Sequence, residues 1–512
     1  MSRQGGLVAS MTLLSRISGL ARDIVLSYLF GASAVADMFF VAFRIPNFFR
    51  RLFAEGAFNQ AFVPVLVRYR ERGTAQLLGF IAPLSGLFGA SLALAVLLGV
   101  VFAPALTYLF APGFASEPGK LDETAALVRL TFPYLGFISL VAYAGAVLNA
   151  HNRFALPAFT PVLLNLSLIG AAMIALSEAV NAAAVTVLAW GVLVAGLLQL
   201  LFQLPAMLRL GLVPQPSLNR KHEGVRQVGT LLLPAVLTAS VGQINALINT
   251  ILASTLITGS ISWLYYADRL LELPVGLVAV ALGTVMLPHL SRMAAQGDPE
   301  KFRQTVDWGV NLGLLLGLPA AVALYLLAEP LIATLFMSFS TGAMTPYDVR
   351  MAGIALEMFA IALPGFVLVK ILAPAFFAHE DTRSPFRYAS VAIAVNLIAS
   401  LATFSWFGHV GLAWATALSA WTHVILLYWG LKHRGHYIAG RNLLPMMWKT
   451  LLACALLALA LLQINQSVAW MSLSSGERLA MVAVVSGGGI AGYLCVLGML
   501  GLRPRHLRHR SG

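Results

Sequence analysis

Residues 34–58 read AVADMFFVAFRIPNFFRRLFAEGAF, a segment long enough to cross the hydrocarbon core of a bilayer, which takes about 20 residues. The segment nevertheless carries five charged side chains: Asp37, Arg44, Arg50, Arg51 and Glu55. The spacing of seven residues places Asp37, Arg44 and Arg51 on one helical face, and Glu55 can pair with Arg51 one turn later. A charge at bilayer depth costs about 2.5–3.5 kcal/mol on insertion scales. Such side chains are therefore expected to face one another or a hydrated cavity.

Two further apolar segments carry the same kind of charge. Residues 6–29 contain Arg16, Arg22 and Asp23, and residues 261–287 contain Asp268, Arg269 and Glu272, which share a helical face with Tyr265. On a straight helix Arg16 and Arg22 would diverge by about 120°, and a bend at Gly19 could bring them together. Because the excess charge is positive, a cavity lined by these residues should attract an anion.

The composition indicates an all-α polytopic membrane protein. Of 512 residues, 59% are hydrophobic and only 10% charged, whereas soluble domains carry roughly 25% charged residues. Apolar runs of sufficient length predict 14 transmembrane helices. They lie near residues 6–29, 34–58, 78–110, 124–149, 157–177, 183–208, 228–254, 261–287, 304–336, 349–378, 386–407, 410–431, 444–466 and 478–501.

The loops between these spans alternate in charge. With the N-terminus and every second loop on one side, that side holds 21 Lys and Arg residues and the other side holds 3. Cytoplasmic loops carry the excess of basic residues, so both termini are predicted to be cytoplasmic. The net charge of +13 is thereby explained without nucleic acid as a partner. The basic tail, residues 502–512, is predicted to anchor the topology near anionic lipid.

Three short patterns recur at nearly one offset along the chain. Pro64-x-Leu66-x-Arg68 returns as Pro288-x-Leu290-x-Arg292, Pro104 with Leu109-Phe110 returns as Pro330 with Leu335-Phe336, and Ala150-His151 with Pro157 returns as Ala378-His379 with Pro385. The offset covers six helices, so the two halves start on the same side as parallel repeats. The sequence predicts a six-helix lobe over 1–215, a second over 226–435 and two extra helices over 444–501. Two such halves around a midplane site are common in alternating-access transporters.

The charged residues allow two interpretations. In one they form ion pairs that lock helices together, with Arg50 and Arg51 marking the cytoplasmic end of their helix. In the other they bind an anion, for which Arg is suited because its planar fork donates bidentate hydrogen bonds to phosphate. The apolar environment also holds Glu357, whose role is less easily explained and which could face the cavity.

Motifs of catalysis and metal binding do not occur in the sequence. A Walker A loop, a GxSxG elbow and an HExxH pair are all missing, and the two cysteines, Cys454 and Cys495, lie in apolar stretches outside any Cys/His cluster. A transporter is therefore favoured over a membrane enzyme, and no metal or other cofactor is predicted.

Several segments resemble the MurJ (MviN) family of lipid II flippases. The most specific are residues 15–23 (SRISGLARD), 36–47 (ADMFFVAFRIPN) and 50–58 (RRLFAEGAF). Residues 111–114 (APGF), 149–154 (NAHNRF) and 265–269 (YYADR) agree as well. The resemblance covers essentially the whole chain.

The resemblance implies a fold of the multidrug/oligosaccharidyl-lipid/polysaccharide exporter superfamily, with a groove for a polyprenyl tail at residues 444–501. It implies that lipid II, the undecaprenyl-diphosphate-linked peptidoglycan precursor, is moved between leaflets of the bacterial inner membrane. By the same resemblance Arg16, Arg22, Arg50 and Arg269 are essential cavity arginines, Asp37 is an essential acid and Glu55 is a gating carboxylate. The remaining charges, Asp23, Arg44, Arg51, Asp268 and Glu272, are predicted to form gating or ion-pair contacts.

The source of energy and the partners follow less directly. Some family members carry an acidic residue of a sodium site in the seventh span, where this chain offers only Gln243, Asn245 and Asn249. Sodium coupling is therefore unsupported, and the membrane potential is an alternative drive. Lipid II and membrane lipids are the predicted partners, with cell-wall synthesis proteins as further candidates. A flippase for another polyprenyl-diphosphate glycan, such as an O-antigen unit, would use the same arginines and stays open.

Overall fold

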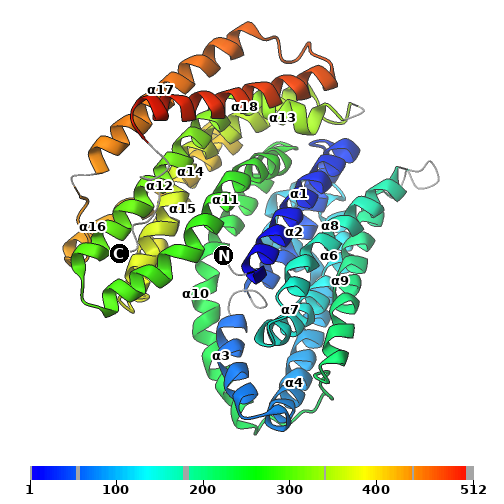
Figure 1. Ribbon diagram of the computed structural model, residues 1–512. Coiled ribbons are helices and arrows are strands. Elements are labelled where there is room, and N and C mark those ends of the chain that lie inside the picture. Colours follow the sequence, from blue (N-terminus) through cyan, green and yellow to red (C-terminus); the bar gives the residue numbers. More distant parts are fainter. Residues whose placement is uncertain (1–2, 53–57, 177–183, 340–341, 441–442, 503–512) are drawn as a thin grey trace. The chain divides into compact units, whose positions relative to one another are not determined.

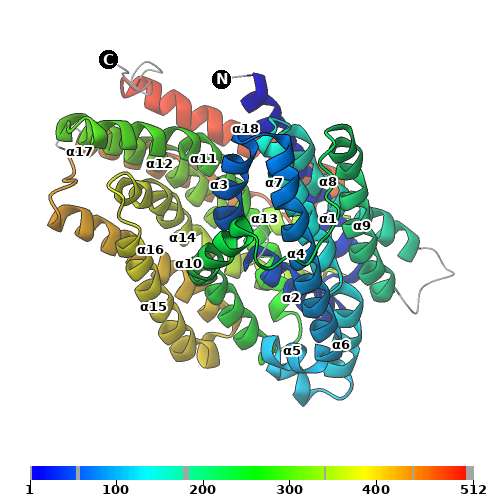
Figure 2. The same ribbon diagram turned by 90° about the horizontal axis from the view of Figure 1, so that it is seen from below.

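The structure is a computed structural model that describes residues 3–52, 58–176, 184–339, 342–440 and 443–502. All regular structure in these ranges is helical, as Figures 1 and 2 show. The chain divides into two units, Met1–Thr258 and Gly259–Gly512. The fold is therefore all-α, as the composition predicted.

Unit 1 is built from ten α-helices and one 3-10 turn in the described ranges. They are α1 (Arg3–Phe30), α2 (Ala34–Phe49), α3 (Phe58–Glu71), α4 (Thr74–Val101), α5 (Ala103–Phe110), η2 (Pro112–Ser116), α6 (Lys120–Thr131), α7 (Tyr134–Ala150), α8 (Ala155–Ala175), α9 (Ala184–Arg209) and α10 (Glu223–Ser254). Within this unit α1 packs on α8, α8 and α7 pack on α9, and α2 packs on α6. These contacts place the charged helices α1 and α2 against apolar helices.

Unit 2 contains the remaining helices. They are α11 (Ser260–Ala295), α12 (Pro299–Leu326), α13 (Ala328–Ile332), the π turn η4 (Ala333–Met337), α14 (Pro346–Phe377), α15 (Arg383–Phe407), α16 (His409–His433), α17 (Leu443–Ser467) and α18 (Ser475–Met499). Helix α14 is central, because α11, α12 and α16 all pack on it, while α17 packs on α12 and on α18.

Close packing in unit 2 depends on small residues on α12. A methyl group at Gly313 would lie 2.6 Å from Cδ1 of Ile371, and one at Gly317 would lie 3.5 Å from Cγ2 of Val367. Ile371 and Val367 belong to α14, so these glycines let the two backbones approach. Small residues are the usual means of close helix contact within a membrane, where lipid competes for apolar surface.

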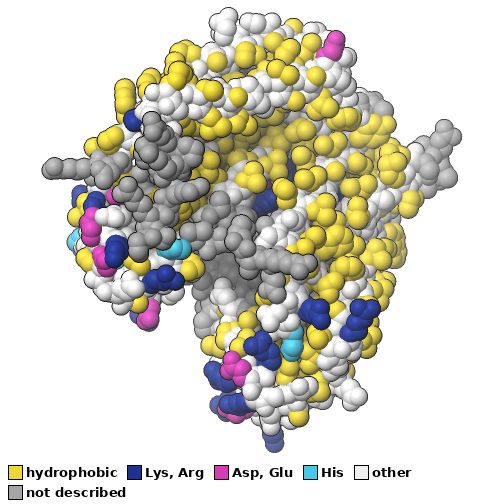
Figure 3. All heavy atoms as spheres, in the orientation of Figure 1, with side chains coloured by type: hydrophobic (Ala, Val, Ile, Leu, Met, Phe, Trp, Pro, Cys, Tyr) yellow, Lys and Arg dark blue, Asp and Glu magenta, His cyan; other side chains and the backbone are white. Residues whose placement is uncertain are grey.

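Ten helical segments of the described chain are long and apolar enough to span a membrane. They correspond to ten of the 14 predicted spans. The other four predicted spans fall on α1, α2, α10 and α11. Three of these helices, α1, α2 and α11, hold the charged residues of the predicted anion site. A polytopic membrane protein is thus confirmed, while the count of 14 stays a prediction. In Figure 3 apolar side chains cover much of the surface, and charged ones gather near the end of unit 1 that carries α3 and in a second group on unit 2.

Three details of the helix prediction were wrong. The span at 78–110 is two helices, α4 and α5, because the chain leaves helical geometry at Phe102 (φ −93°, ψ 21°). The span at 304–336 breaks in the same way at Leu327 (φ −104°, ψ 19°). The repeated prolines, Pro104 and Pro330, follow these breaks, and a proline near a helix start needs no N–H donor there. The third error is α3, which occupies a stretch that was expected to be a loop.

The repeated Ala-His pattern forms the same turn in both units. Asn152 and Glu380 follow the two histidines and have φ angles of 61° and 59°. They are the only non-glycine residues with positive φ in the described chain. The next residue donates its N–H to a carbonyl in the last helical turn on both sides, from Arg153 to Leu148 at 2.9 Å and from Asp381 to Phe376 at 3.1 Å. This is the way in which a left-handed residue satisfies the carbonyls at the end of a helix.

The division into units differs from the predicted lobes at one helix. The repeat placed α10 in the second lobe, whereas its contacts are with α3, α4, α5 and η2 of unit 1. Lobes defined by an internal repeat and units defined by contact need not coincide. The boundaries 1–215, 226–435 and 444–501, and the tail 502–512, which lies almost wholly outside the described residues, remain predictions.

Candidate functional site

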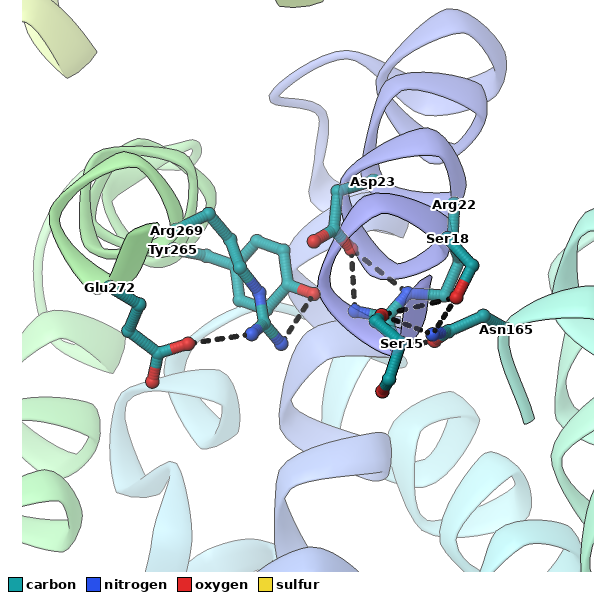
Figure 4. Close-up of polar contacts among 8 residues, drawn as sticks. All are labelled: Ser15, Ser18, Arg22, Asp23, Asn165, Tyr265, Arg269 and Glu272. Atoms are coloured by element: carbon teal, nitrogen blue, oxygen red, sulfur yellow. Dashed lines mark hydrogen bonds and ion pairs between the residues drawn. The ribbon is translucent and has the colours of Figure 1, made fainter. Parts of the chain in front are cut away.

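The charged residues of α1 form a buried cluster in unit 1 (Figure 4). Both Nε and Nη2 of Arg22 donate to Oδ1 of Asp23, at 2.9 and 2.7 Å. Arg22 is 5% exposed and Asp23 is fully buried. The spacing of the two residues did not predict this pair, because adjacent residues point about 100° apart on a helix. The long arginine side chain reaches across that angle.

Asn165 of α8 completes this cluster. Its Oδ1 accepts a hydrogen bond from Nη1 of Arg22 at 3.0 Å, and its Nδ2 donates to the Ser18 hydroxyl at 2.9 Å and to the Ser15 carbonyl at 3.1 Å. The sequence analysis missed this residue. The available signal was a lone amide in the middle of the apolar span at 157–177, since an amide at that depth needs hydrogen-bonding partners.

Close approach of α1 and α8 is possible at Gly19, where a methyl group would lie 3.6 Å from Nδ2 of Asn165. Helix α1 is continuous through this glycine from Arg3 to Phe30. The glycine therefore leaves room for the amide of Asn165 in ordinary contact. Arg16 lies on the same helix and is half-buried.

The charged residues of α2 and of the segment after it have different surroundings. Asp37 is 2% exposed and lies in the first turn of the helix, where a negative charge is favoured by the helix dipole. Arg44 donates from Nη1 to the Thr250 hydroxyl of α10 at 2.5 Å, and Arg50 donates from Nε to Oδ1 of Asn47 at 3.0 Å. Arg51 is exposed. Its predicted partner, Glu55, lies outside the described residues.

The charges of α11 form a more open cluster in unit 2 (Figure 4). Arg269 donates from Nη1 to Oε2 of Glu272 at 2.9 Å and from Nη2 to the Tyr265 hydroxyl at 3.3 Å. The side chains of Arg269 and Glu272 are 28% and 42% exposed. Tyr265, Arg269 and Glu272 therefore share one helical face, as predicted. Asp268 is half-buried beside them.

These clusters have different chemical capacities. Arg22 is enclosed, and the three nitrogens of its guanidinium all donate to neighbouring side chains. Arg269 has accessible surface and is bound to a carboxylate that is itself exposed. An incoming phosphate oxygen could replace Glu272 on this guanidinium, because both are anionic oxygen acceptors for the same fork.

Metal ligation has little support in the described part of the chain, where no group of three or more His, Cys, Asp or Glu side chains could hold an ion. On α10, Oδ1 of Asn245 is buried and finds no hydrogen-bond partner among the described residues. One amide oxygen is too few ligands to define a sodium site.

Comparison with known proteins decides the family. Residues 26–480 match the family model described as "Lipid II flippase MurJ". The chain belongs to the MurJ lipid II flippase family. It is 42% identical to a probable lipid II flippase MurJ of Vibrio cholerae, over 99% of this chain and 97% of that protein. It is also 37% identical to the lipid II flippase MurJ of Burkholderia cenocepacia, over 98% of each chain.

Solved structures agree with this assignment to the MurJ family. A structure described as "Lipid II flippase MurJ, inward closed conformation" superposes with a TM-score of 0.80 at 25% identity, over 96% of this chain and 98% of that one. An inward-facing multidrug resistance MATE family transporter of the MOP superfamily superposes with a TM-score of 0.67 at 15% identity, over 84% of this chain and 98% of that one. The second likeness shows a shared fold only. The family resemblance inferred from residues 15–58 is thus confirmed, and the chain is a transporter rather than an enzyme.

Proposed function

We propose that this chain moves lipid II from the cytoplasmic to the periplasmic leaflet of the bacterial inner membrane by alternating access. Membership of a lipid II flippase family supports the substrate and its role in peptidoglycan biosynthesis. The single structural observation that carries the proposal is Arg269. It is a guanidinium with accessible surface on α11, which the sequence predicts to span the membrane, and it is held by a partly exposed carboxylate that a phosphate can replace.

The physical case rests on the cost of moving a diphosphate through hydrocarbon. Transfer of an isolated ionised group from water to a medium of low dielectric constant costs tens of kcal/mol of free energy. Guanidinium groups that donate in pairs to phosphate oxygens replace the lost water shell. The polyprenyl tail can stay in lipid while the head group passes. Arg16, Arg22, Arg50 and Arg269 are the residues we assign to diphosphate binding, with Arg22 held by Asp23 while the site is empty and exchanged onto phosphate when lipid II binds. We assign Asp23, Asp37, Arg44, Arg51, Glu55, Asp268 and Glu272 to gating and ion pairing.

The orientation and architecture are part of the same proposal. We propose 14 spans with both termini cytoplasmic, arranged as two six-helix lobes with α17 and α18 forming a groove for the tail. The 21-to-3 distribution of basic residues supports the orientation, and the identical turns at Asn152 and Glu380 support parallel repeats. Exchange between two states would then expose the site to either side. The membrane potential or an ion gradient would supply the energy.

Complementation with matched protein levels tests the proposal. In a strain depleted of its own flippase, Arg269→Ala should lower transport of lipid II roughly tenfold to a hundredfold, the loss expected for a charge-assisted contact of ~1.5–3 kcal/mol. Arg269→Lys should recover part of it, because the charge returns without the fork. The matched control is Arg292→Ala, which removes an exposed arginine from the same helix and should leave transport unchanged.

The substrate is tested by following which lipid-linked precursor accumulates. Depletion of this protein should leave lipid II at the cytoplasmic face. Accumulation of a different polyprenyl-diphosphate glycan would replace lipid II as the substrate but leave the role of the arginine intact. Normal transport of lipid II by the Arg269→Ala variant would instead contradict the assignment of Arg269 to diphosphate binding.

A further inference from the structure

Residues 434–440, which connect α16 to α17 in unit 2, are bound to α12 through a buried carboxylate. The Tyr437 hydroxyl and the Gly440 N–H both donate to Oδ1 of Asp307, at 2.7 and 3.3 Å. A methyl group at Gly440 would overlap Oδ2 of Asp307, so the glycine allows this close approach. The C-terminal end of the connection is therefore held against α12.

The N-terminal end of the same connection is held by the turn that follows α14. Arg434 binds the carboxylate of Asp381 and donates from Nη2 to the Ser384 hydroxyl at 2.6 Å. Between the two attachments lie two stacked imidazoles. The ring centroids of His379 and His436 are 3.9 Å apart, with 12° between the ring planes. Both histidines are half-buried and lie outside the predicted spans.

The surroundings of this histidine pair favour its neutral form. Phe302 of α12 is the second aromatic neighbour of His379, with 4.8 Å between ring centroids, and Nε2 of His379 is buried without a hydrogen-bond partner among the described residues. Because an imidazolium donates from both nitrogens, a proton on this ring would lack an acceptor at Nε2. Burial and the neighbouring His436 lower the pKa of His379. Burial and Arg434 lower the pKa of His436, and Asp381 opposes them.

The other charged groups near the pair have partners of their own. On α12, Arg303 binds Glu300 at 2.6 Å and Asp307 at 3.5 Å. At the end of α16, His433 is exposed and stacks on Trp429 of its own helix, with 5.3 Å between ring centroids. A proton on either stacked imidazole therefore gains little from these groups.

The turn after α14 also depends on its surroundings. Glu380 has a φ angle of 59°, and a non-glycine residue keeps this conformation only where neighbouring contacts hold it. The equivalent turn of unit 1 has Asn152 at this position, a residue type that adopts the conformation more readily. The histidine of that turn, His151, lies with Nδ1 2.8 Å from the Val147 carbonyl of its own helix. The stack on a second histidine is thus a feature that the repeated turn does not itself require.

We propose that the stack of His379 on His436 is a pH-sensitive latch, which holds residues 434–440 in place at neutral pH and releases them in acid. Two neutral rings can stack, whereas positive charges on both rings would repel each other at 3.9 Å. Once the rings separate, water supplies the acceptor that Nε2 of His379 lacks.

The direction of the pH effect follows from the difference in proton binding between the two forms. The open form binds protons more readily than the closed one, because the closed form lowers the pKa of both imidazoles. Closure is therefore complete above the ordinary imidazole pKa of about 6.5 and is lost as the pH falls below it. In the orientation proposed above, the latch lies on the cytoplasmic side and would respond to acidification of the cytoplasm.

Amide hydrogen exchange of the full-length protein in nanodiscs tests the latch. The reporter is the segment 437–440, in which the Gly440 N–H is bonded to Asp307. After correction for the intrinsic effect of pH on exchange, its protection should fall about tenfold between pH 7.5 and pH 5.5, because an imidazole of ordinary pKa gains its proton over that interval. Equal protection at the two pH values would overturn the proposal.

Phenylalanine at both positions separates the latch from other titrating groups. The His379→Phe/His436→Phe variant keeps two aromatic rings but cannot be protonated there, so its protection should change less than about twofold over the same interval. His151→Phe, in the equivalent turn of unit 1, is the matched control and should respond to acid as the wild type does. A double variant that responds as strongly as the wild type would overturn the proposal and assign the titration to a carboxylate such as Asp381.

A second measurement needs no substitution and decides the question even if the double variant fails to fold. Exchange of the imidazole C2 hydrogen, followed by mass spectrometry, titrates each histidine of the wild-type protein. The pKa of His379 and that of His436 should lie below the ordinary value in the native protein and return to it after denaturation. Ordinary titration of both histidines in the native protein would overturn the latch. These results are independent of lipid II transport, because neither histidine belongs to the proposed diphosphate site.

Discussion

Arg22 in unit 1 and Arg269 in unit 2 are charged residues of α1 and α11, two helices that the sequence predicts to span the membrane, yet their surroundings differ. Arg22 is 5% exposed and bonded to a fully buried aspartate and to an amide of another helix. The Arg269 side chain is 28% exposed and is bonded to Glu272 and Tyr265 of its own helix. The comparison teaches that an arginine in a predicted span can connect helices or stay available to a ligand. Residue type and depth do not distinguish these roles, whereas burial and partners do.

The largest expected effect is on stability at Arg22. Arg22→Ala should lower the free energy of unfolding by about 3–5 kcal/mol, because it leaves the buried carboxylate of Asp23 without its cation. Titration of the purified protein with SDS measures this free energy. The double variant Arg22→Ala/Asp23→Ala should recover much of the loss, since removal of both charges removes the uncompensated one.

An Arg22→Ala protein as stable as the wild type would contradict the contrast drawn between Arg22 and Arg269. It would mean that the pair with Asp23 contributes nothing to the fold and that Arg22 is as available to a ligand as Arg269. Failure of the double variant to recover would instead assign the loss to the contact with Asn165.

Much of this architecture could be predicted from hydropathy, because a helix that crosses lipid must be apolar over a fixed length. The repeated Ala-His pattern also indicated that the chain would have similar local structure at the two places where the turns at Asn152 and Glu380 occur. The breaks at Phe102 and Leu327 were not, since the flanking residues are as apolar as the spans that they interrupt. The position of the following prolines was the only local signal.

The candidate site was predicted in part. The face shared by Tyr265, Arg269 and Glu272 follows from helical spacing, which relates residues three and four apart. The Arg22–Asp23 pair does not, because its geometry depends on how far a flexible side chain bends. The role of Asn165 depends on a contact between helices that are distant in sequence, and no periodicity within one helix reports such a contact.

A smaller effect is expected at Asn165. Asn165→Ala should lower the free energy of unfolding by about 1–3 kcal/mol, because Nη1 of Arg22 then lacks an acceptor in a buried site. The same SDS titration measures it. Leu166→Ala, at a neighbouring residue of α8 that is 52% exposed, is the control and should stay within about 0.5 kcal/mol of the wild type. A loss at Asn165 no larger than that at Leu166 would show that Arg22 finds another acceptor.

The smallest effect on stability is expected at Arg269, where the largest effect on transport is proposed. Arg269→Ala should change the free energy of unfolding by only about 0.2–1 kcal/mol, because its ion pair with Glu272 is partly exposed and lies within one helix, and such pairs contribute little. The measurement is again the SDS titration, made on the same preparation as the transport assay. A loss above about 3 kcal/mol would place Arg269 with Arg22 among the residues that hold the fold, and a fall in transport could then no longer be assigned to the diphosphate. A small loss of stability with a large loss of transport is the combination expected of an accessible, ligand-binding guanidinium.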